Sequence, residues 1–318
     1  MEHEQTIAPS KPIVGLALGS GAAKGWAHLG VLRGLANLGV HPDKVAGCSI
    51  GAVVGAAYAN DMHQELEEWV LGFSSWDVLG LMDLSWRRGG LIGGEKVFDA
   101  LESRIGDLSI ENLKRPFAAV ATDLYSGQEI WFKQGELRRA VRASCSMPGI
   151  LQPIKHGGRW LVDGAVVNPI PVSITRALGA DVVIAVDVNG HRRSKMPTLP
   201  VEMDANAVSS LSHQESDPHD ESDFMDLLAR GKEYISGLTD KFSNDERAAP
   251  GMLAVMSQSM EILEQRHKRA RLMGDPPDVC IVPDVVDIGT MEFHRAKEAI
   301  YAGEKAVEQV AHLIEAAL

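Results

Sequence analysis

Residues 47–51 form the pattern Gly-x-Ser-x-Gly, with Ser49 at its centre. An apolar segment precedes this pattern, and a run of small apolar residues follows it. Small neighbours such as Gly47 and Gly51 allow a sharp strand-to-helix turn, which lifts the serine hydroxyl clear of the backbone. The turn also points the N-terminus of the next helix towards negative charge that develops on an attacked carbonyl. The spacing therefore indicates that Ser49 is a nucleophile for acyl transfer.

A second turn of small residues, 19–25, lies upstream between an apolar segment and a helical pattern. The backbone N–H groups of Gly21 and Ala22 are candidates to bind an oxyanion at the start of that helix. A dinucleotide loop is a poor match, because the glycines stand at 19, 21 and 25 and not at G-x-G-x-x-G spacing. A Walker phosphate loop does not fit either, because Lys24 precedes a glycine and no Ser or Thr follows it.

Asp163 is the third candidate for chemistry. It ends an apolar segment and precedes Gly164, so its carboxylate is expected at the carboxyl edge of a sheet, although Asp-Gly is also common in ordinary turns. A Ser…Asp…His order also exists, with His294 as the third member; this histidine equally fits a helix start that packs against the sheet. Cys48 is an alternative nucleophile, but Cys48 and Cys145 are more simply interpreted as small buried packing residues.

Four segments in order, 16–32, 46–52, 142–150 and 161–169, resemble the patatin-like phospholipase family, and its bacterial RssA-type branch most closely. The resemblance implies a Ser–Asp dyad without a catalytic histidine, in which Ser49 is the nucleophile and Asp163 the proton acceptor. It also implies an oxyanion hole in the glycine-rich turn, with Lys24 at a basic position of the family. The sequence departs from many members at Ser20 and Ala22, where they have glycine. The supporting residues of the two turns and of the aspartate are Gly19, Ser20, Lys24, Gly25, Gly47, Gly51 and Gly164.

Such a dyad implies an acyl-enzyme ester at Ser49, which water activated by Asp163 then hydrolyses. A carboxylate ordinarily titrates near ~4, so it should be partly desolvated in order to accept the serine proton well. The expected substrate is a lipid-type acyl ester, and no cofactor or metal is expected. One alternative is an acyltransferase on the same scaffold, with a serine paired to histidine. Another is a regulatory or scaffold protein whose hydrolase site is vestigial.

Strands that alternate with helices predict an α/β fold, a three-layer α/β/α sandwich with a mostly parallel central sheet. The turns described above would then lie between strands and the helices that follow them. The expected strands are 13–18, 45–48, 117–122, 129–132, 160–162, 181–188 and 278–282. The expected helices are 27–38, 50–59, 136–143, 251–272 and 291–317.

The 318 residues fit one large domain, 12–318, after a loose N-terminal tail at 1–11. Its core is expected at 12–190 and its C-terminal helices and strand at 251–318. Residues 191–250 are rich in Ser, Asp, His and Glu, which predicts a surface insertion with a flexible loop and a helix near 224–239. A metal site at His213 and His219 is not expected there. The apolar stretch 62–86 is predicted to be helical with loop breaks, and it fits either core packing or a lid that faces lipid.

A net charge of −12 argues against nucleic acid as a partner and against simple electrostatic docking on anionic lipid. The basic run 265–271 is interpreted as a solvated helix face. Three cysteines give neither a disulfide framework nor zinc spacing. The N-terminus lacks a signal-peptide pattern and no apolar run approaches the ~20 residues of a membrane span, so a cytoplasmic location is expected. Contact with a membrane would be peripheral and transient, and the sequence does not indicate an oligomeric state.

Overall fold

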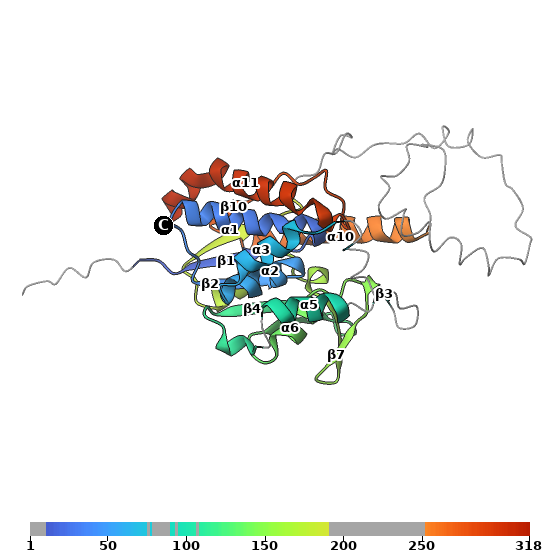
Figure 1. Cartoon of the computed structure of the whole chain (residues 1–318). Coiled ribbons are helices and arrows are strands. Elements are labelled where there is room, and N and C mark those ends of the chain that lie inside the picture. Colours follow the sequence, from blue (N-terminus) through green and yellow to red (C-terminus); the bar gives the residue numbers. More distant parts are fainter. Residues whose placement is uncertain (1–10, 75–76, 78–89, 93–94, 106–107, 191–251) are drawn as a thin grey trace, which may run out of the picture. The chain divides into compact units, whose positions relative to one another are not determined.

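The computed structural model describes the chain except for residues 1–10, 75–76, 78–89, 93–94, 106–107 and 191–251 (Figure 1). The predicted insertion at 191–250 lies wholly outside the described residues, together with its two histidines. The predicted N-terminal tail also lies outside them apart from Lys11, as does most of the second half of the apolar stretch 62–86. The elements described below belong to one compact unit, formed by Met1–His191 and Pro250–Leu318.

Within the described residues, an eight-stranded sheet has the order β10-β9-β1-β2-β4-β8-β7, and β5 pairs with β4 outside this path. Neighbours from β10 to β4 are parallel, whereas β4 pairs antiparallel with β5 and β8, and β8 with β7. Strands β3 and β6 form a separate parallel pair. The strands are β1 Val14–Leu18, β2 Lys44–Cys48, β3 Gly90–Ile92, β4 Phe117–Asp123, β5 Glu129–Phe132, β6 Gly149–Leu151, β7 Ile154–His156, β8 Arg159–Asp163, β9 Val182–Val186 and β10 Val279–Ile281.

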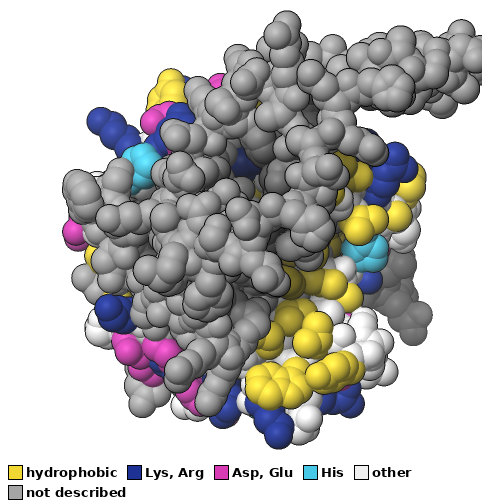
Figure 2. Space-filling model, turned by 90° about the vertical axis from the view of Figure 1, so that its right-hand side faces the viewer, with side chains coloured by type: hydrophobic (Ala, Val, Ile, Leu, Met, Phe, Trp, Pro, Cys, Tyr) yellow, Lys and Arg dark blue, Asp and Glu magenta, His cyan; other side chains and the backbone are white. Residues whose placement is uncertain are grey.

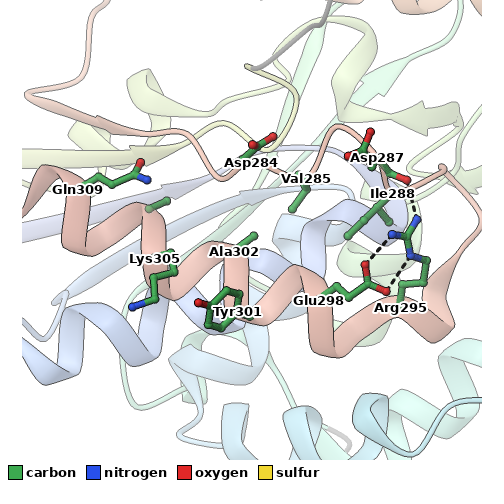
Figure 3. Close-up of a pocket in the computed structure, with 11 residues that line it drawn as sticks. Asp284, Val285, Asp287, Ile288, Arg295, Glu298, Tyr301, Ala302, Lys305 and Gln309 are labelled. Atoms are coloured by element: carbon green, nitrogen blue, oxygen red, sulfur yellow. Dashed lines mark hydrogen bonds and ion pairs between the residues drawn. The ribbon is translucent and has the colours of Figure 1, made fainter.

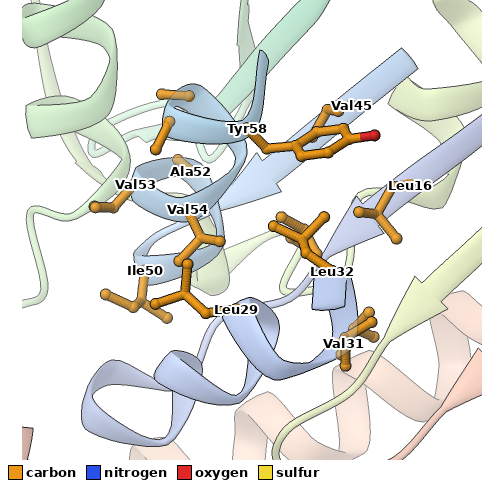
Figure 4. Packing of buried hydrophobic residues seen from close by; sticks show 14 of the residues in the cluster. Leu16, Leu29, Val31, Leu32, Val45, Ile50, Ala52, Val53, Val54 and Tyr58 are labelled. Carbon is orange, nitrogen blue, oxygen red and sulfur yellow. The ribbon is translucent and has the colours of Figure 1, made fainter. Parts of the chain in front are cut away.

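Helices cover both faces of this sheet. Leu16 and Leu18 of β1 pack into a core with side chains of α1, α2 and α11, whereas Ala17 between them packs with Val172 of α7 on the opposite face. Figure 4 shows part of the first core, where side chains of α1 and α2 meet those of β1 and β2. The helices are α1 Ala27–Asn37, α2 Ile50–Ala59, α3 His63–Leu71, α5 Glu95–Ile105, α6 Leu137–Ser144, α7 Val172–Ala177, α10 Met252–Gly274 and α11 Ala296–Ala317, and the 3-10 turns are η1 Ala22–Trp26, η2 Ile110–Asn112, η3 Gly164–Val166 and η4 Phe293–Arg295.

This arrangement confirms the predicted α/β fold with a mostly parallel central sheet between helical layers. It adds α5 and α7 and the short strands β3, β6 and β7, which the sequence patterns did not indicate. Of the helices within the described residues, none is long and apolar enough to cross a bilayer.

Strand β4 brings the ends of β2 and β8 together. Strand β5 pairs with residues 119–122 of β4 and therefore fills one edge of that stretch. Strand β2 pairs with residues 117–120 and β8 with residues 121–123, so both must lie along the other edge, one beyond the other. The last residue of β2, Cys48, is opposite Val120, and the last residue of β8, Asp163, is opposite Ala121. Ser49, which follows Cys48, therefore lies next to Asp163.

Candidate active site

Ser49 lies in the sharp turn between β2 and α2, with backbone angles φ 56° and ψ −123°. This positive φ is uncommon for a residue with a side chain and is typical of strained functional turns. Its N–H donates a hydrogen bond of 2.9 Å to the Ser144 hydroxyl of α6. The turn is therefore held by a second element of the fold, and Ser49 is only 5% exposed.

The glycines on each side of Ser49 are required by backbone contacts. A Cβ on Gly47 would lie 2.3 Å from the carbonyl oxygen of Gly51, and a Cβ on Gly51 would lie 2.2 Å from that of Leu18. A Cβ on Gly25 would lie 2.1 Å from Ile50 Cγ2 in α2. The serine turn and the glycine-rich turn after β1 therefore pack directly on each other, and neither leaves room for a side chain at these positions.

Replacing Ser49 by glycine is expected to leave a more stable protein than replacing it by alanine, by about 1 kcal/mol in the free energy of unfolding. Both variants lose the hydroxyl, but only glycine adopts a φ of 56° without strain. Urea unfolding of the two variants at one pH measures the difference. Equal midpoints, or a more stable alanine variant, would show that the backbone of this turn is not strained.

Asp163 ends β8 and faces the serine. The Ser49 Oγ donates to Asp163 Oδ2 at 2.6 Å, and the Ala165 N–H donates to Asp163 Oδ1 at 2.8 Å. The aspartate backbone is fixed as well, because its N–H donates to the carbonyl of Ser146 and its carbonyl accepts from the hydroxyl of Thr122. These bonds leave the carboxylate with one orientation, in which one oxygen faces the serine and the other faces the start of η3.

Burial raises the pKa of Asp163 from 3.8 to about 7, although the hydrogen bonds from Ser49 and Ala165 lower it. The carboxyl is 2% exposed, so desolvation of its charge is the largest effect. A Cβ on the following Gly164 would lie 2.4 Å from the carbonyl oxygen of Val120, so β4 packs tightly against this turn. Asp163 therefore has the pKa and the contact with Ser49 that a proton acceptor needs near neutral pH.

The glycine-rich turn extends from the end of β1. In the first half of the turn, the N–H of Gly19 donates to the carbonyl of Val186 and the N–H of Ser20 donates to the carbonyl of Pro169. In the second half, the N–H groups of Ala23 and Lys24 also donate to backbone carbonyls. The N–H groups of Gly21 and Ala22 have no hydrogen-bond partner among the described residues. Ala22 has a φ of 48°, and a Cβ on Gly21 would lie 2.2 Å from Val188 Cγ2. The turn thus holds both donors in a fixed backbone.

His28 fixes this turn from α1. It is fully buried, and its Nε2 lies 2.8 Å from the carbonyl oxygen of Gly19. Burial lowers the pKa of His28 to about 4, so the ring is neutral at pH 7 and Nε2 donates to that carbonyl. Lys24 belongs to the same turn, and its Nζ donates to Asn189 Oδ1 at 3.4 Å.

Sequence patterns did not assign roles to three residues that the structure brings to these turns: Ser144, His28 and Glu264. Ser144 and His28 both lie within segments that carried the family resemblance, but no local pattern showed which backbone groups they bind. Glu264 lies on α10, where its Oε1 accepts the Ser20 hydroxyl at 2.7 Å. The contacts of Ser144 with Ser49 and of Glu264 with Ser20 join residues that are distant in sequence, so they become visible only in the folded chain.

Two alternatives receive no support from this geometry. Cys48 is fully buried, and burial together with the Asp163 carboxylate holds the pKa of its thiol well above the ordinary value. His294 is exposed in η4, and within the described residues no histidine makes a hydrogen bond to Ser49 or Asp163. Cys48 Sγ does lie 3.9 Å from Asp163 Oδ1, but its burial and raised pKa disfavour the thiolate that a nucleophile needs. His294 has no hydrogen bond to Ser49 or Asp163 that would let it act as a base.

A cavity of about 390 Å³ lies elsewhere, between α11 and the segment after β10 (Figure 3). Arg295 at its edge is paired with Glu298 and also donates to the carbonyl of Asp287. None of the residues that line this cavity belongs to the serine turn, the glycine-rich turn or the end of β8. Among the described residues, no group of three or more His, Cys, Asp or Glu is placed to hold a metal ion.

Comparison with known proteins gives consistent matches. The sequence profile of the family described as patatin-like phospholipase matches residues 16–176. An uncharacterized NTE family protein of Mycobacterium tuberculosis is 32% identical over 335 residues, which cover 96% of this chain and 93% of the relative.

Two longer proteins match in part. Neuropathy target esterase sws of Drosophila melanogaster is 34% identical over 185 residues, and human patatin-like phospholipase domain-containing protein 6 is 35% identical over 193 residues. These matches cover 56% and 58% of this chain but only 13% and 14% of the two relatives.

Proposed function

The chain belongs to the patatin-like phospholipase family and is a lipid ester hydrolase, and on this premise we propose that it works through a dyad of Ser49 and Asp163. The observation that carries the proposal is the 2.6 Å hydrogen bond from Ser49 Oγ to Asp163 Oδ2, with no histidine hydrogen-bonded to either residue among the described residues. The relatives carry NTE family names, and assignment to the RssA-type branch stays a prediction.

In the first half of the proposed reaction, Ser49 Oγ attacks the ester carbonyl and its proton passes to Asp163 Oδ2. The tetrahedral intermediate collapses, the bond to the leaving alkoxide breaks, and Asp163 returns the proton to that oxygen. In the second half, Asp163 takes a proton from water, which attacks the acyl-enzyme ester, and the proton then returns to Ser49 Oγ as the fatty acid leaves. No other proton carrier is needed, because one carboxylate acts in both halves.

We assign the oxyanion hole to the N–H groups of Gly21 and Ala22. Three observations support this role: these donors lack partners among the described residues, the turn packs on the serine turn at Gly25, and His28 fixes its backbone. Strands β1 and β2 are parallel neighbours with Leu18 opposite Gly47, so both turns leave the sheet at the same edge. Fixed backbone donors stabilise an oxyanion well because they need no reorganisation during the reaction.

The rate of ester hydrolysis is expected to rise with pH through about 7 and then to level off. Asp163 accepts a proton only when it is ionised, and burial raises its pKa to about 7, so activity is lost as pH falls through that value. The measurement is kcat/KM for a short p-nitrophenyl ester between pH 5 and 9. A profile that is flat down to pH 5 would show that a group other than this buried carboxylate accepts the proton.

The substrate is proposed to be presented at a lipid surface by transient peripheral contact. Figure 2 shows one face of the molecule on which exposed hydrophobic side chains gather beside Lys and Arg side chains. Exposed large apolar side chains outside α10 include Leu124, Tyr125, Trp131 and Trp160. Aromatic side chains favour the interface between water and lipid, whereas the net charge of −12 disfavours purely electrostatic binding to anionic lipid.

The direct test of this function is hydrolysis of a lipid panel, comprising phospholipid, lysophospholipid and neutral acyl esters, by wild type and by Ser49→Ala. We expect release of fatty acid from at least one class by wild type and none above background by Ser49→Ala. Equal release by both proteins would reject the proposal. The acyltransferase alternative predicts transfer to an added acceptor and dependence on a histidine, and His294→Ala is the variant that separates it from the dyad.

A further inference from the structure

Helix α10 contacts the glycine-rich turn and the segment after β9 with three polar side chains, of which one, Lys268, is buried. Glu264 accepts a hydrogen bond from Ser20 Oγ, Gln265 donates to the carbonyl of Asn189, and Lys268 lies 2.8 Å from both carboxylate oxygens of Asp187. Lys268 is 3% exposed, so this ion pair is shielded from water. These contacts fix α10 beside the proposed site.

The contact between Glu264 and Ser20 bears directly on the proposed oxyanion hole. Ser20 is 7% exposed and precedes Gly21, one of the two proposed oxyanion donors. Its N–H already donates to the carbonyl of Pro169, and its own carbonyl accepts from the Asn189 side chain at 3.4 Å. The hydroxyl adds a bond of 2.7 Å to a carboxylate, which is a stronger type of hydrogen bond than those between neutral groups.

We propose that Glu264 is a positioning residue of this hydrolase, which holds the glycine-rich turn through Ser20 and places a negative charge near the dyad. The inference rests on the proposed function of Ser49 and Asp163. Glu264 does not touch the reacting atoms in the structure; it acts through Ser20 on the neighbouring N–H of Gly21 and through space on Asp163.

The charges around both carboxyls are consistent with this role. Asp163 is faced by Ser49, Cys48 and the Ala165 N–H. Burial has the largest effect on the pKa of Asp163, and the negative charge of Glu264 raises that pKa further. Burial raises the pKa of Glu264 itself, the Ser20 hydrogen bond and Lys268 lower it, and Glu261 and Asp187 raise it. Removal of the Glu264 charge should therefore lower the pKa of Asp163 and leave the dyad ionised at more acidic pH.

Two variants separate the charge from the hydrogen bond. Glu264→Gln keeps an oxygen that accepts from Ser20 but removes the charge, so we expect the acid limb of kcat/KM to move to lower pH while the plateau rate stays within about 3-fold of wild type. Ser20→Ala removes the hydrogen bond, so we expect the plateau kcat to fall about 10-fold. Glu315→Gln is the matched control, because it makes the same substitution at an exposed residue of α11 that does not contact Ser20 and does not affect the pKa of Glu264 or Asp163. Its acid limb and plateau rate should match wild type.

The pH profiles of the three variants and wild type test the positioning role of Glu264, and thermal unfolding checks that each protein is folded. An unmoved acid limb in Glu264→Gln, or full plateau activity in Ser20→Ala, would overturn the positioning role while the dyad stands. Absence of Ser49-dependent turnover by wild type would instead reject the proposed function and this inference with it. If Ser20→Ala proves unstable, the acid limb of the isosteric Glu264→Gln variant still tests the positioning role.

Discussion

Replacement of Asp163 by Asn is expected to reduce kcat/KM for an acyl ester by about 10³-fold, because the amide cannot accept the proton of Ser49. The variant keeps the size of the side chain and one oxygen in a site that is 2% exposed, so the turn should stay in place. The measurement is steady-state hydrolysis at pH 8, where wild-type Asp163 is ionised.

Asp284→Asn is the matched control for this change. It makes the same substitution at an exposed aspartate of the segment after β10 and should retain wild-type activity. An Asp163→Asn variant with more than about a tenth of wild-type activity would contradict the assignment of Asp163 as the proton acceptor.

Asp163→Asn is also expected to stabilise the fold at pH 8. The Asp163 carboxyl has a pKa of about 7 in the folded chain and an ordinary value of 3.8, which we take for the unfolded chain, so it binds its proton more tightly in the folded state. The wild-type free energy of unfolding therefore falls as pH rises from about 4 to about 7, by an upper bound on the order of 4 kcal/mol. Asn carries no such charge, so its melting temperature should exceed that of wild type at pH 8 and approach it at pH 4. A lower melting temperature at pH 8 would show that the hydrogen bonds of the carboxylate outweigh its desolvation.

Replacement of Gly51 by Ala is expected to cost about 3 kcal/mol of folding free energy and to reduce kcat by about 10²-fold. Its Cβ would lie 2.2 Å from the carbonyl oxygen of Leu18 and 2.7 Å from that of Gly19. Both contacts are with backbone, so α2 must move away from β1 and take Ser49 with it. Urea unfolding and hydrolysis measure the two effects on the same preparation.

Gly72→Ala provides the control for that change. The nearest atom to a Cβ at Gly72 is a backbone oxygen 3.4 Å away, which is ordinary contact. This variant should differ from wild type by less than about 1 kcal/mol and keep full activity. A Gly51→Ala protein as stable and as active as Gly72→Ala would show that the two turns do not need their close backbone packing.

The parts of the fold that repeat a simple pattern were predictable from sequence. The apolar segments that became β1, β2 and β9 are short and bounded by glycine or polar residues, and the two turns between strand and helix follow from small residues at fixed spacing. The proximity of Ser49 and Asp163 was expected only from the family resemblance. Its physical cause, two strands aligned end to end along one edge of β4, depends on pairing between distant segments.

Other parts had no usable local signal. Helix α7 has six residues, too few to show a helical period, and β6 and β7 have three residues each. The basic run 265–271 was interpreted as a solvated face, and this is wrong for Lys268, which is buried against Asp187. A charge pattern along a helix shows which side chains are charged but not which of them a distant carboxylate will bury.

The most direct test of the proposed dyad is mass spectrometry of the protein after reaction with a fluorophosphonate, which traps an activated serine as a covalent adduct. At pH 8 we expect a single adduct on wild type, located on Ser49 by peptide mapping. The adduct should be absent from Ser49→Ala and formed about 10³-fold more slowly in Asp163→Asn. An adduct on another residue, or equal labelling rates in wild type and Asp163→Asn, would contradict the dyad of Ser49 and Asp163.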